Sequence, residues 1–364
     1  MEYRKISELT TVVTGGTPST SVGEYWNDGN IPWLQSGCCQ NCEVDSTERY
    51  ITQAGYDNSS ARMMPKHTIM IALTGATAGK IGYLNFEACG NQSITGILPC
   101  EFLNQRFLFY YLISKRPQIL ADCVGGAQAH ISQGYVKNIK IPMYPLEKQV
   151  EVVNVLDGIT SIIIARKLEL QSFDELIKSR FVELFGDPVS NSKGLKELTL
   201  PELGELGRGV SKHRPRNAPE LLGGEYPLIQ TGEVSNAGLY IENYENTYSE
   251  LGYKQSKMWK AGTLCITIAA NIAKTAILKF DACFPDSVVG FKANDKTNEI
   301  FIHYWFSFFQ AILEAQAPES AQKNINLKIL SELKVIAPDI EEQNKFATFV
   351  VQVDKSKLLK RTKI

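Results

Sequence analysis

The chain repeats itself at a long interval, and this repeat limits its possible folds more than any other feature of the sequence. Segments of the first half recur in the second half in the same order, displaced by 194 or 195 residues. The matching pairs are "IPWLQSG" at 31–37 with "YPLIQTG" at 226–232, "FEAC" at 86–89 with "FDAC" at 280–283, and "PLEKQ" at 145–149 with "DIEEQ" at 339–343. The 364 residues therefore hold two copies of one unit, and both copies should adopt similar folds.

Each copy begins with a part that mixes strands and helices. Short β-rich runs, such as 68–73 and 262–269, alternate with Gly, Pro and Asn turns. One apolar helix follows in each copy, at 105–120 and at 300–313, and its aromatic residues recur at helical spacing. We expect these rings to pack in the core of each unit rather than to stack on nucleic-acid bases.

A long helix follows each mixed part. Residues 147–185 contain no proline and a single glycine, and "FGDP" at 185–188 should end this helix. A seven-residue spacing predicts a seam for a second helix. Its positions are Gln149, Leu156, Ile163, Leu170, Ile177 and Leu184, with Val152, Ile159 and Phe173 three residues on. The second helix should start at Glu341 and run to Ile364, which makes it about fifteen residues shorter than the first helix.

These elements predict an α+β protein in which two tandem α/β domains are separated by long antiparallel coiled-coil helices. The expected parts are a domain at 1–146, a central helix at 147–187, a second domain at 188–339 and a short distal helix at 340–364. A duplicated chain that folds in this way has approximate two-fold symmetry.

Composition excludes several classes of protein. The net charge of −1 rules out a uniformly basic surface, and no apolar run is long enough to span a membrane. The eight cysteines include one CxxC, formed by Cys39 and Cys42, but no second pair at zinc-site spacing. We therefore expect neither a metal nor another cofactor. The first residues lack the apolar core of a signal peptide, which favours a cytoplasmic protein.

The stretch "LTGATAGKIGYL" at 73–84 raises the alternative of an ATP-linked enzyme. A phosphate-binding loop needs four residues between its first glycine and its Gly-Lys pair, followed by Ser or Thr. Here three residues separate Gly75 from Gly79, and Ile81 follows Lys80. The second copy reads "IAANIAKTAIL" and lacks both glycines, although its Lys274 aligns with Lys80. The turn is therefore expected to present polar atoms and a positive charge rather than a phosphate cradle.

The chain resembles the specificity subunits of type I restriction–modification enzymes over essentially its whole length. The resemblance lies in "GGTPSTSVGEYWNDGNIPWLQSG" at 15–37, "IALTGATAGKIGYL" at 71–84, "QAHISQGYVKNIKIPMYPLEKQ" at 128–149 and "KLELQSFDELIKSRFVELFGDP" at 167–188, and in their counterparts in copy two. These motifs are specific in combination, whereas each alone would be weak.

This resemblance implies a non-catalytic protein with two target-recognition domains, each of which reads half of a split sequence in double-stranded DNA. It also implies that the long helices separate these domains and dock methyltransferase subunits, through which the restriction and translocase subunit is reached indirectly. The sequence contains no Asn/Asp-Pro-Pro-Tyr/Phe motif of DNA methyltransferases.

Polar loop residues are the candidate DNA contacts under this resemblance, because forked donors and acceptors read base edges and cations hold phosphates. The candidates are Thr17, Ser19, Thr20 and Ser21 with Ser211, Lys212, His213, Arg214 and Arg216 in the loop after the first helix of each copy; Thr77, Lys80 and Lys274 in the turn; and Gln128, His130, Gln322, Lys323, Asn324 and Asn326 after the aromatic helix. A solvated basic loop or an ordinary polar turn would explain the same residues without DNA. Gln35 and Gln230 lie in apolar runs, where we expect structural hydrogen bonds instead.

A free-standing DNA-binding regulator without an enzyme partner is a further interpretation of the same features. Co-purification with a methyltransferase would distinguish a specificity subunit from such a regulator. Stabilisation of the isolated chain by ATP would favour the ATP-linked enzyme over both.

Overall fold

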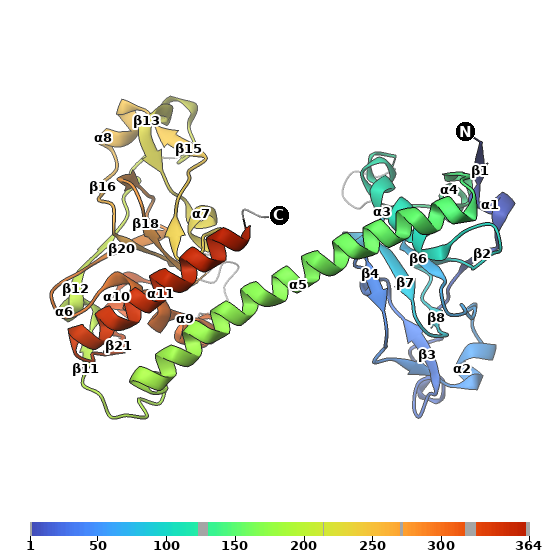
Figure 1. Ribbon diagram of the computed structural model, residues 1–364, viewed down its shortest axis with the longest axis horizontal. Helices are drawn as coiled ribbons and strands as arrows, with labels where there is room; N and C mark the ends of the chain where they lie inside the picture. Colours follow the sequence, from blue (N-terminus) through green and yellow to red (C-terminus); the bar gives the residue numbers. More distant parts are fainter. Residues whose placement is uncertain (1, 123–129, 214, 270–271, 317–324, 362–364) are drawn as a thin grey trace. The chain divides into compact units, whose positions relative to one another are not determined.

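The computed structural model describes residues 2–122, 130–213, 215–269, 272–316 and 325–361. The chain forms two compact units, unit 1 at residues 1–164 and unit 2 at residues 165–364 (Figure 1). Each unit is described by itself below.

Unit 1 is built on a five-stranded sheet of short strands. The strand order is β2-β9-β6-β7-β4, and only β4 runs parallel to its neighbour. These strands are β2 (Val12–Thr14), β4 (Cys42–Val44), β6 (Ile69–Ala72), β7 (Ile81–Leu84) and β9 (Ile94–Ile97). Every residue of β6, β7 and β9 is buried, so both faces of the sheet are covered there. This burial explains why their sequences are nearly continuous apolar runs rather than alternating ones.

Smaller elements surround this sheet. A second sheet has the order β5-β3-β8, and β1 pairs antiparallel with β10, which closes the unit just before the long helix. The elements are β1 (Tyr3–Lys5), β3 (Ile31–Leu34), β5 (Tyr50–Ile51), β8 (Cys89–Gly90), β10 (Lys140–Pro142), α1 (Ile6–Leu9), α2 (Gln53–Asp57), α3 (Gln105–Ala121) and α4 (Gln133–Asn138). The aromatic helix α3 packs on β6 and β7.

Unit 2 repeats this architecture and thereby confirms the duplication. Its five-stranded sheet has the order β12-β20-β17-β18-β14, which matches unit 1 strand for strand, and β11 pairs with β21 as β1 pairs with β10. Its second sheet has one strand more, in the order β15-β13-β19-β16.

The strands of unit 2 are β11 (Glu197–Thr199), β12 (Gly204–Arg208), β13 (Leu222–Leu228), β14 (Tyr240–Ile241), β15 (Asn246–Tyr248), β16 (Met258–Trp259), β17 (Leu264–Thr267), β18 (Thr275–Leu278), β19 (Ala282–Cys283), β20 (Val288–Ala293) and β21 (Lys334–Ile336). Its shorter helices are α6 (Leu200–Leu203), α7 (Thr231–Asn236), α8 (Glu250–Lys254), α9 (Glu299–Gln316) and α10 (Leu327–Glu332).

The two aromatic helices, α3 and α9, contribute rings to the cores of their units. Phe107 is 6% exposed and Trp305 is fully buried, as predicted for core packing. Tyr111, at the position that matches Trp305, is only half-buried, and its hydroxyl donates to the backbone carbonyl of Lys140 at 2.8 Å. The two copies therefore differ at this point of the helix.

The two predicted long helices are α5 (Leu146–Phe185) and α11 (Ile340–Arg361). Gly186, at a φ of 78°, follows α5 and ends it. Within unit 2, Lys357 Nζ donates to Asp174 at 2.5 Å, and the rings of Phe346 and Phe181 lie 5.4 Å apart between centroids. Asp174 of α5 contacts Lys357 of α11, and the later residue Phe181 contacts the earlier residue Phe346. The two helices therefore run antiparallel within this unit, as predicted (Figure 1).

The predicted seven-residue seam does not continue along the whole of α5. Ile177 is fully buried, but Ile159 and Ile163 are 48% and 41% exposed. In the last part of α5 the buried positions are four residues apart, at Ile177, Phe181 and Phe185. The prediction of a continuous seam is wrong, because the described residues of α11 lie beside only the last part of α5.

One buried glutamine anchors the first turn of α5 to unit 1. Gln149 has no exposed surface. Its Oε1 accepts the backbone N–H of Asn104 at 2.8 Å, and its Nε2 donates to the backbone carbonyls of Tyr144 and Phe102 at 2.8 and 3.3 Å. Gln149, which the seven-residue spacing predicted to face a second helix, therefore joins α5 to unit 1 instead.

Unit 2 uses the same arrangement at the matching residue, Gln343, which is also fully buried. Its Oε1 accepts the hydroxyl of Thr297 at 2.8 Å, and its Nε2 donates to the backbone carbonyls of Pro338 and Lys296 at 2.8 and 3.0 Å. We call this repeated set of three hydrogen bonds the glutamine clasp. It satisfies backbone groups that burial would otherwise leave unpaired.

Replacing Gln149 or Gln343 with Leu should destabilise the protein by about 2–4 kcal/mol, because leucine fills a similar volume but leaves clasped polar groups buried without partners. Urea unfolding followed by circular dichroism measures this change. Gln171→Leu, on the exposed face of α5, is the matched control and should change the free energy of unfolding by less than about 0.5 kcal/mol. Equal effects at all three positions would contradict the role of the clasp.

Candidate nucleic-acid interface

The loops of unit 1 gather at one end of its two sheets. Strands β2, β3 and β6 run toward this end, and β7 and β9 start from it. Backbone hydrogen bonds tie the loops together: Gly16 N–H donates to Gly90 O at 2.8 Å, and Asn91 N–H donates to Leu34 O at 2.8 Å. Segments that are far apart in sequence therefore present their side chains from one surface, which we call the loop end of unit 1.

The structure brings three of the predicted site residues of unit 1 together at this loop end. Thr17 is exposed, and its hydroxyl donates to Gln92 Oε1 at 2.5 Å. His130 is exposed and forms a β-bridge with Thr74, next to the turn that contains Thr77. The loop end thus combines hydroxyl, imidazole and amide groups, which can all hydrogen-bond to base edges.

The remaining predicted residues of this unit lie on both sides of that group. Lys80 follows the turn, and its ammonium donates to Gln40 Oε1 at 2.5 Å. Ser19, Thr20 and Ser21 are exposed in the loop after β2, where the hydroxyls of Ser19 and Ser21 are 2.8 Å apart. Gln128 lies outside the described residues.

The corresponding loop of unit 2 is fastened to its neighbours by several contacts. The backbone N–H groups of Lys212 and His213 donate to Gln255 Oε1 at 2.6 and 3.0 Å. Arg216 forms an ion pair with Asp286. Lys212 is exposed, the side chains of His213 and Arg216 are 42% and 43% exposed, and Ser211 is buried. Arg214 lies outside the described residues.

Lys274 occupies a different environment from its counterpart Lys80. It lines a polar cavity of about 370 Å³ together with Lys178, Lys357 and His303. Burial holds the pKa of His303 at about 4, and its Nδ1 lies 2.9 Å from the hydroxyl of Thr275. This histidine is therefore neutral near pH 7, and the charges of the cavity are those of its three lysines and of Asp174 and Asp354, of which Asp174 is paired with Lys357.

The last group of predicted residues in unit 2 is described only at Asn326. Its Oδ1 accepts the backbone N–H of Ile329 at 2.9 Å and caps α10, as Ser132 caps α4 in unit 1. This hydrogen bond gives the Asn326 side chain a role within the fold. Gln322, Lys323 and Asn324 lie outside the described residues.

The exposure of Gln35 at the loop end differs from the expectation drawn from the sequence. Gln35 was expected to make structural hydrogen bonds, but its side chain is exposed where β3 ends. Gln230, at the matching place after β13, belongs to a capping box with Glu233, as that expectation implies. The available signal was position: each glutamine follows directly after a short apolar strand, where the chain turns at the loop end.

Metal-binding groups are not assembled in the described part of the chain, where no three His, Cys, Asp or Glu side chains cluster in a way suited to an ion. Among the same residues, no helix has the length and apolar character needed to cross a lipid bilayer. The cysteines that the structure describes are free thiols.

Comparison with known families identifies the repeated unit. The model of the type I restriction modification DNA specificity domain matches residues 1–171 and again residues 193–364. The chain belongs to this family. The two matches coincide with the two copies found in the sequence, so the chain carries two specificity domains in tandem.

Several type I restriction enzyme specificity subunits are similar to this chain at low sequence identity. The type I restriction enzyme EcoR124I/EcoR124II specificity subunit of Escherichia coli is 28% identical over 162 residues, which are 43% of this chain and 40% of the relative. The MjaIX specificity subunit of Methanocaldococcus jannaschii is 27% identical over 71% of this chain and 63% of its own length. The chain thus spans less than two thirds of both. The MjaVIII specificity subunit of the same organism is 23% identical, with 99% of this chain and 87% of the relative covered.

Solved structures share the fold of this specificity-domain chain. The S subunit of a type I restriction–modification system from M. genitalium superposes with a TM-score of 0.57 at 16% identity, and the match covers 100% of this chain and 91% of that chain. A chain from the type I R-M system, solved for its complex assembly and conformational transition, gives a TM-score of 0.55 at 17% identity, with 99% and 92% covered.

Replacing Lys212 with Ala should weaken binding to double-stranded DNA of any sequence and reduce the slope of log affinity against log salt by about 0.9, the value for one lost phosphate contact. The melting temperature should stay unchanged, because the exposed side chain lies outside the core. Fluorescence anisotropy over a salt series measures the slope. Lys260→Ala is the matched control, since Lys260 lies at the opposite end of the sheet beside the start of β17. Identical slopes for both variants would remove Lys212 from the interface.

Proposed function

We propose that this chain is the specificity subunit of a type I restriction–modification system. In this proposal each unit reads one half of a split target in double-stranded DNA through its loop end. The chain itself carries no catalytic site and docks methyltransferase subunits, which connect it to the restriction subunit. The relatives' names and the family membership support this assignment.

The observation that carries the proposal is the repetition of one scaffold with different side chains at its loop end. Thr17 and Gln92 of unit 1 match Ser211 and Asp286 of unit 2 in position, and in both units the first loop is tied to the turn that precedes the last strand of the sheet. Unit 1 makes this tie with an uncharged hydrogen bond, whereas unit 2 uses the Arg216 ion pair. Two domains that read different half-sites need the same scaffold with different side chains in the loops.

The hydrogen bonds of the turn at 73–80 disfavour the ATP-linked alternative. Gly79 N–H donates to Ala72 O at 2.9 Å, Ala78 N–H to Gly75 O at 3.0 Å, and Lys80 N–H to Thr77 O at 2.8 Å. A phosphate cradle needs such N–H groups free and pointing at the ligand. Here these N–H groups are already bonded to backbone carbonyls within the same segment.

Replacing residues 1–146 with the equivalent part of another specificity subunit should change one half of the recognised sequence and leave the other half unchanged. The target is read from the methylation pattern that the assembled enzyme leaves on genomic DNA. The reciprocal exchange of residues 188–339 should change only the other half. An exchange that alters both halves would show that the units do not read independently.

Lengthening α5 should lengthen the unread gap between the half-sites. Four residues inserted after Ile162 add one helical turn, or ~6 Å, which corresponds to one or two base pairs at ~3.4 Å each. The insertion lies in an exposed stretch of α5, so packing at Gln149 and at Phe181 should survive. The same methylation assay measures the gap. Four residues inserted after Asn243, in an exposed loop of unit 2, are the control and should leave the gap unchanged. A constant gap in both variants would mean that α5 does not set the spacing.

A further inference from the structure

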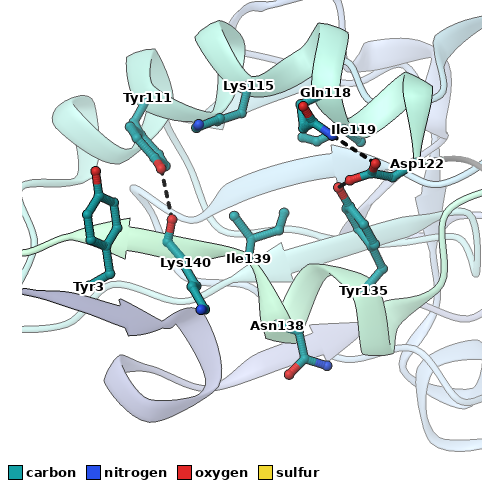
Figure 2. A pocket seen from close by; sticks show the side chains of 10 residues that line it. All are labelled: Tyr3, Tyr111, Lys115, Gln118, Ile119, Asp122, Tyr135, Asn138, Ile139 and Lys140. Atoms are coloured by element: carbon teal, nitrogen blue, oxygen red, sulfur yellow. Dashed lines mark hydrogen bonds between the residues drawn. The ribbon is translucent and has the colours of Figure 1, made fainter.

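Unit 1 contains a groove on the side of α3 that faces α4 and the β1–β10 pair, and Figure 2 shows the side chains that line it. Its volume is about 540 Å³, within the range of pockets that hold a ligand or a large side chain. Ile119 is buried and, with Ile139, provides an apolar surface between the tyrosine rings of Tyr3, Tyr111 and Tyr135.

The polar groups in the walls of the groove are already paired with one another. At one end the Tyr111 hydroxyl donates to the backbone carbonyl of Lys140 at 2.8 Å. At the other end Asp122 accepts hydrogen bonds on both carboxylate oxygens, from Gln118 at 2.8 Å and from Tyr135 at 2.7 Å (Figure 2). These bonds hold the rings of Tyr111 and Tyr135 in place, so a ligand would meet two preformed apolar faces.

Two lysines, Lys115 and Lys140, line the groove together with one carboxylate, Asp122, so its net charge is positive. Lys115 lies with its ammonium 5.7 Å from the centroid of the Tyr111 ring and forms no ion pair with any residue that the structure describes. Lys140 stands directly opposite Lys5 in the antiparallel β1–β10 pair, and both are exposed. Like charges opposite each other in a sheet are unfavourable by themselves. An acidic group placed between them would relieve this repulsion.

Unit 2 fills the same position with its own aromatic rings. The residue that matches Tyr111 is Trp305, which is fully buried and stacks on Phe309 with 4.1 Å between ring centroids. Phe309 matches Lys115. Unit 2 also lacks the opposed lysines, since Thr199 stands opposite Lys334 at the matching point of its strand pair. At matching points of one scaffold, unit 2 thus carries two stacked aromatic rings, whereas unit 1 carries a tyrosine and a lysine beside the groove.

We infer that the groove of unit 1 docks a segment of a partner protein in which an aromatic side chain is flanked by acidic residues. The aromatic ring enters between the tyrosines and packs on Ile119 and Ile139. The flanking carboxylates meet Lys115 and the Lys5–Lys140 pair. This docking is independent of the reading of DNA, because the groove is built from α3, α4 and the β1–β10 pair and contains none of the predicted DNA contacts.

The probe for this inference is the peptide acetyl-Glu-Glu-Trp-Glu-Glu-amide, titrated by calorimetry into the full chain. Two comparison peptides separate the contributions of ring and charge: one carries Ala in place of Trp, and one carries Lys in place of every Glu. We expect both to bind at least tenfold more weakly than the probe. Equal binding of the three peptides, or no binding of the probe, would overturn the inference.

Filling the groove with larger side chains should abolish peptide binding while the protein stays folded. The double substitution Tyr111→Trp with Lys115→Phe copies the residues of unit 2, and we expect it to weaken probe binding at least tenfold while circular dichroism and DNA binding stay unchanged. Lys115→Gln keeps the groove open and removes one charge, so it should weaken the probe but keep the preference for Trp over Ala.

Lys66→Gln removes an exposed charge elsewhere on unit 1 and is the control for general electrostatic attraction. It should leave probe binding unchanged. Undiminished binding to the filled variant, or equal losses in Lys66→Gln and Lys115→Gln, would show that the peptide binds elsewhere. If the filled variant does not fold, the single substitution Lys115→Gln and its control decide the question.

Discussion

The structure of each unit depends on a buried amide that joins the start of a long helix to the loop before the aromatic helix. Gln149 and Gln343 are fully buried, and each makes three hydrogen bonds, two of which go to backbone carbonyls at matching positions. A buried amide that lacked these partners would cost more than the bonds gain, so the side chain holds only one arrangement of helix and loop. Five of the six bonds go to backbone groups. The clasp therefore depends little on other side chains, with the Thr297 hydroxyl as the exception, and the loops can diverge while the start of the helix stays fixed to its unit.

The same separation between scaffold and loop appears at the candidate interface. Backbone hydrogen bonds such as Gly16 to Gly90 define the loop end, and the exposed side chains there differ between the copies. In unit 1 they are mainly hydroxyl and amide groups, whereas the loop of unit 2 carries Lys212, His213 and Arg216. Under the proposed function this arrangement is useful, because side chains that specify a DNA sequence can change without altering the backbone that positions them.

Much of the fold could be predicted from the sequence, because duplication doubles every signal. Two copies of each apolar run distinguish strands from accidental patterns, and the absence of proline between 147 and 185 leaves few alternatives to a long helix. The seam was wrong because spacing records which face of a helix is apolar but not what covers it, and Ile159 and Ile163 proved exposed. Gln149 was misassigned for the same reason. The roles of Asn326 as a cap and of Gln35 as an exposed residue depend on local backbone geometry, which one sequence does not reveal.

The two ties at the loop ends differ in physical character, and this difference gives the halves of the protein unequal responses to ionic strength. Thr17 and Gln92 join through a neutral hydrogen bond, which dissolved ions hardly affect. Arg216 and Asp286 join through charges whose side chains are 43% and 24% exposed, so salt screens their attraction. As the salt concentration rises, the attraction between Arg216 and Asp286 weakens, whereas the hydrogen bond between Thr17 and Gln92 does not. If each unit reads one half of a DNA target, as proposed, discrimination at the half read by unit 2 should fade earlier than at the other half, even if both halves contact the same number of phosphates.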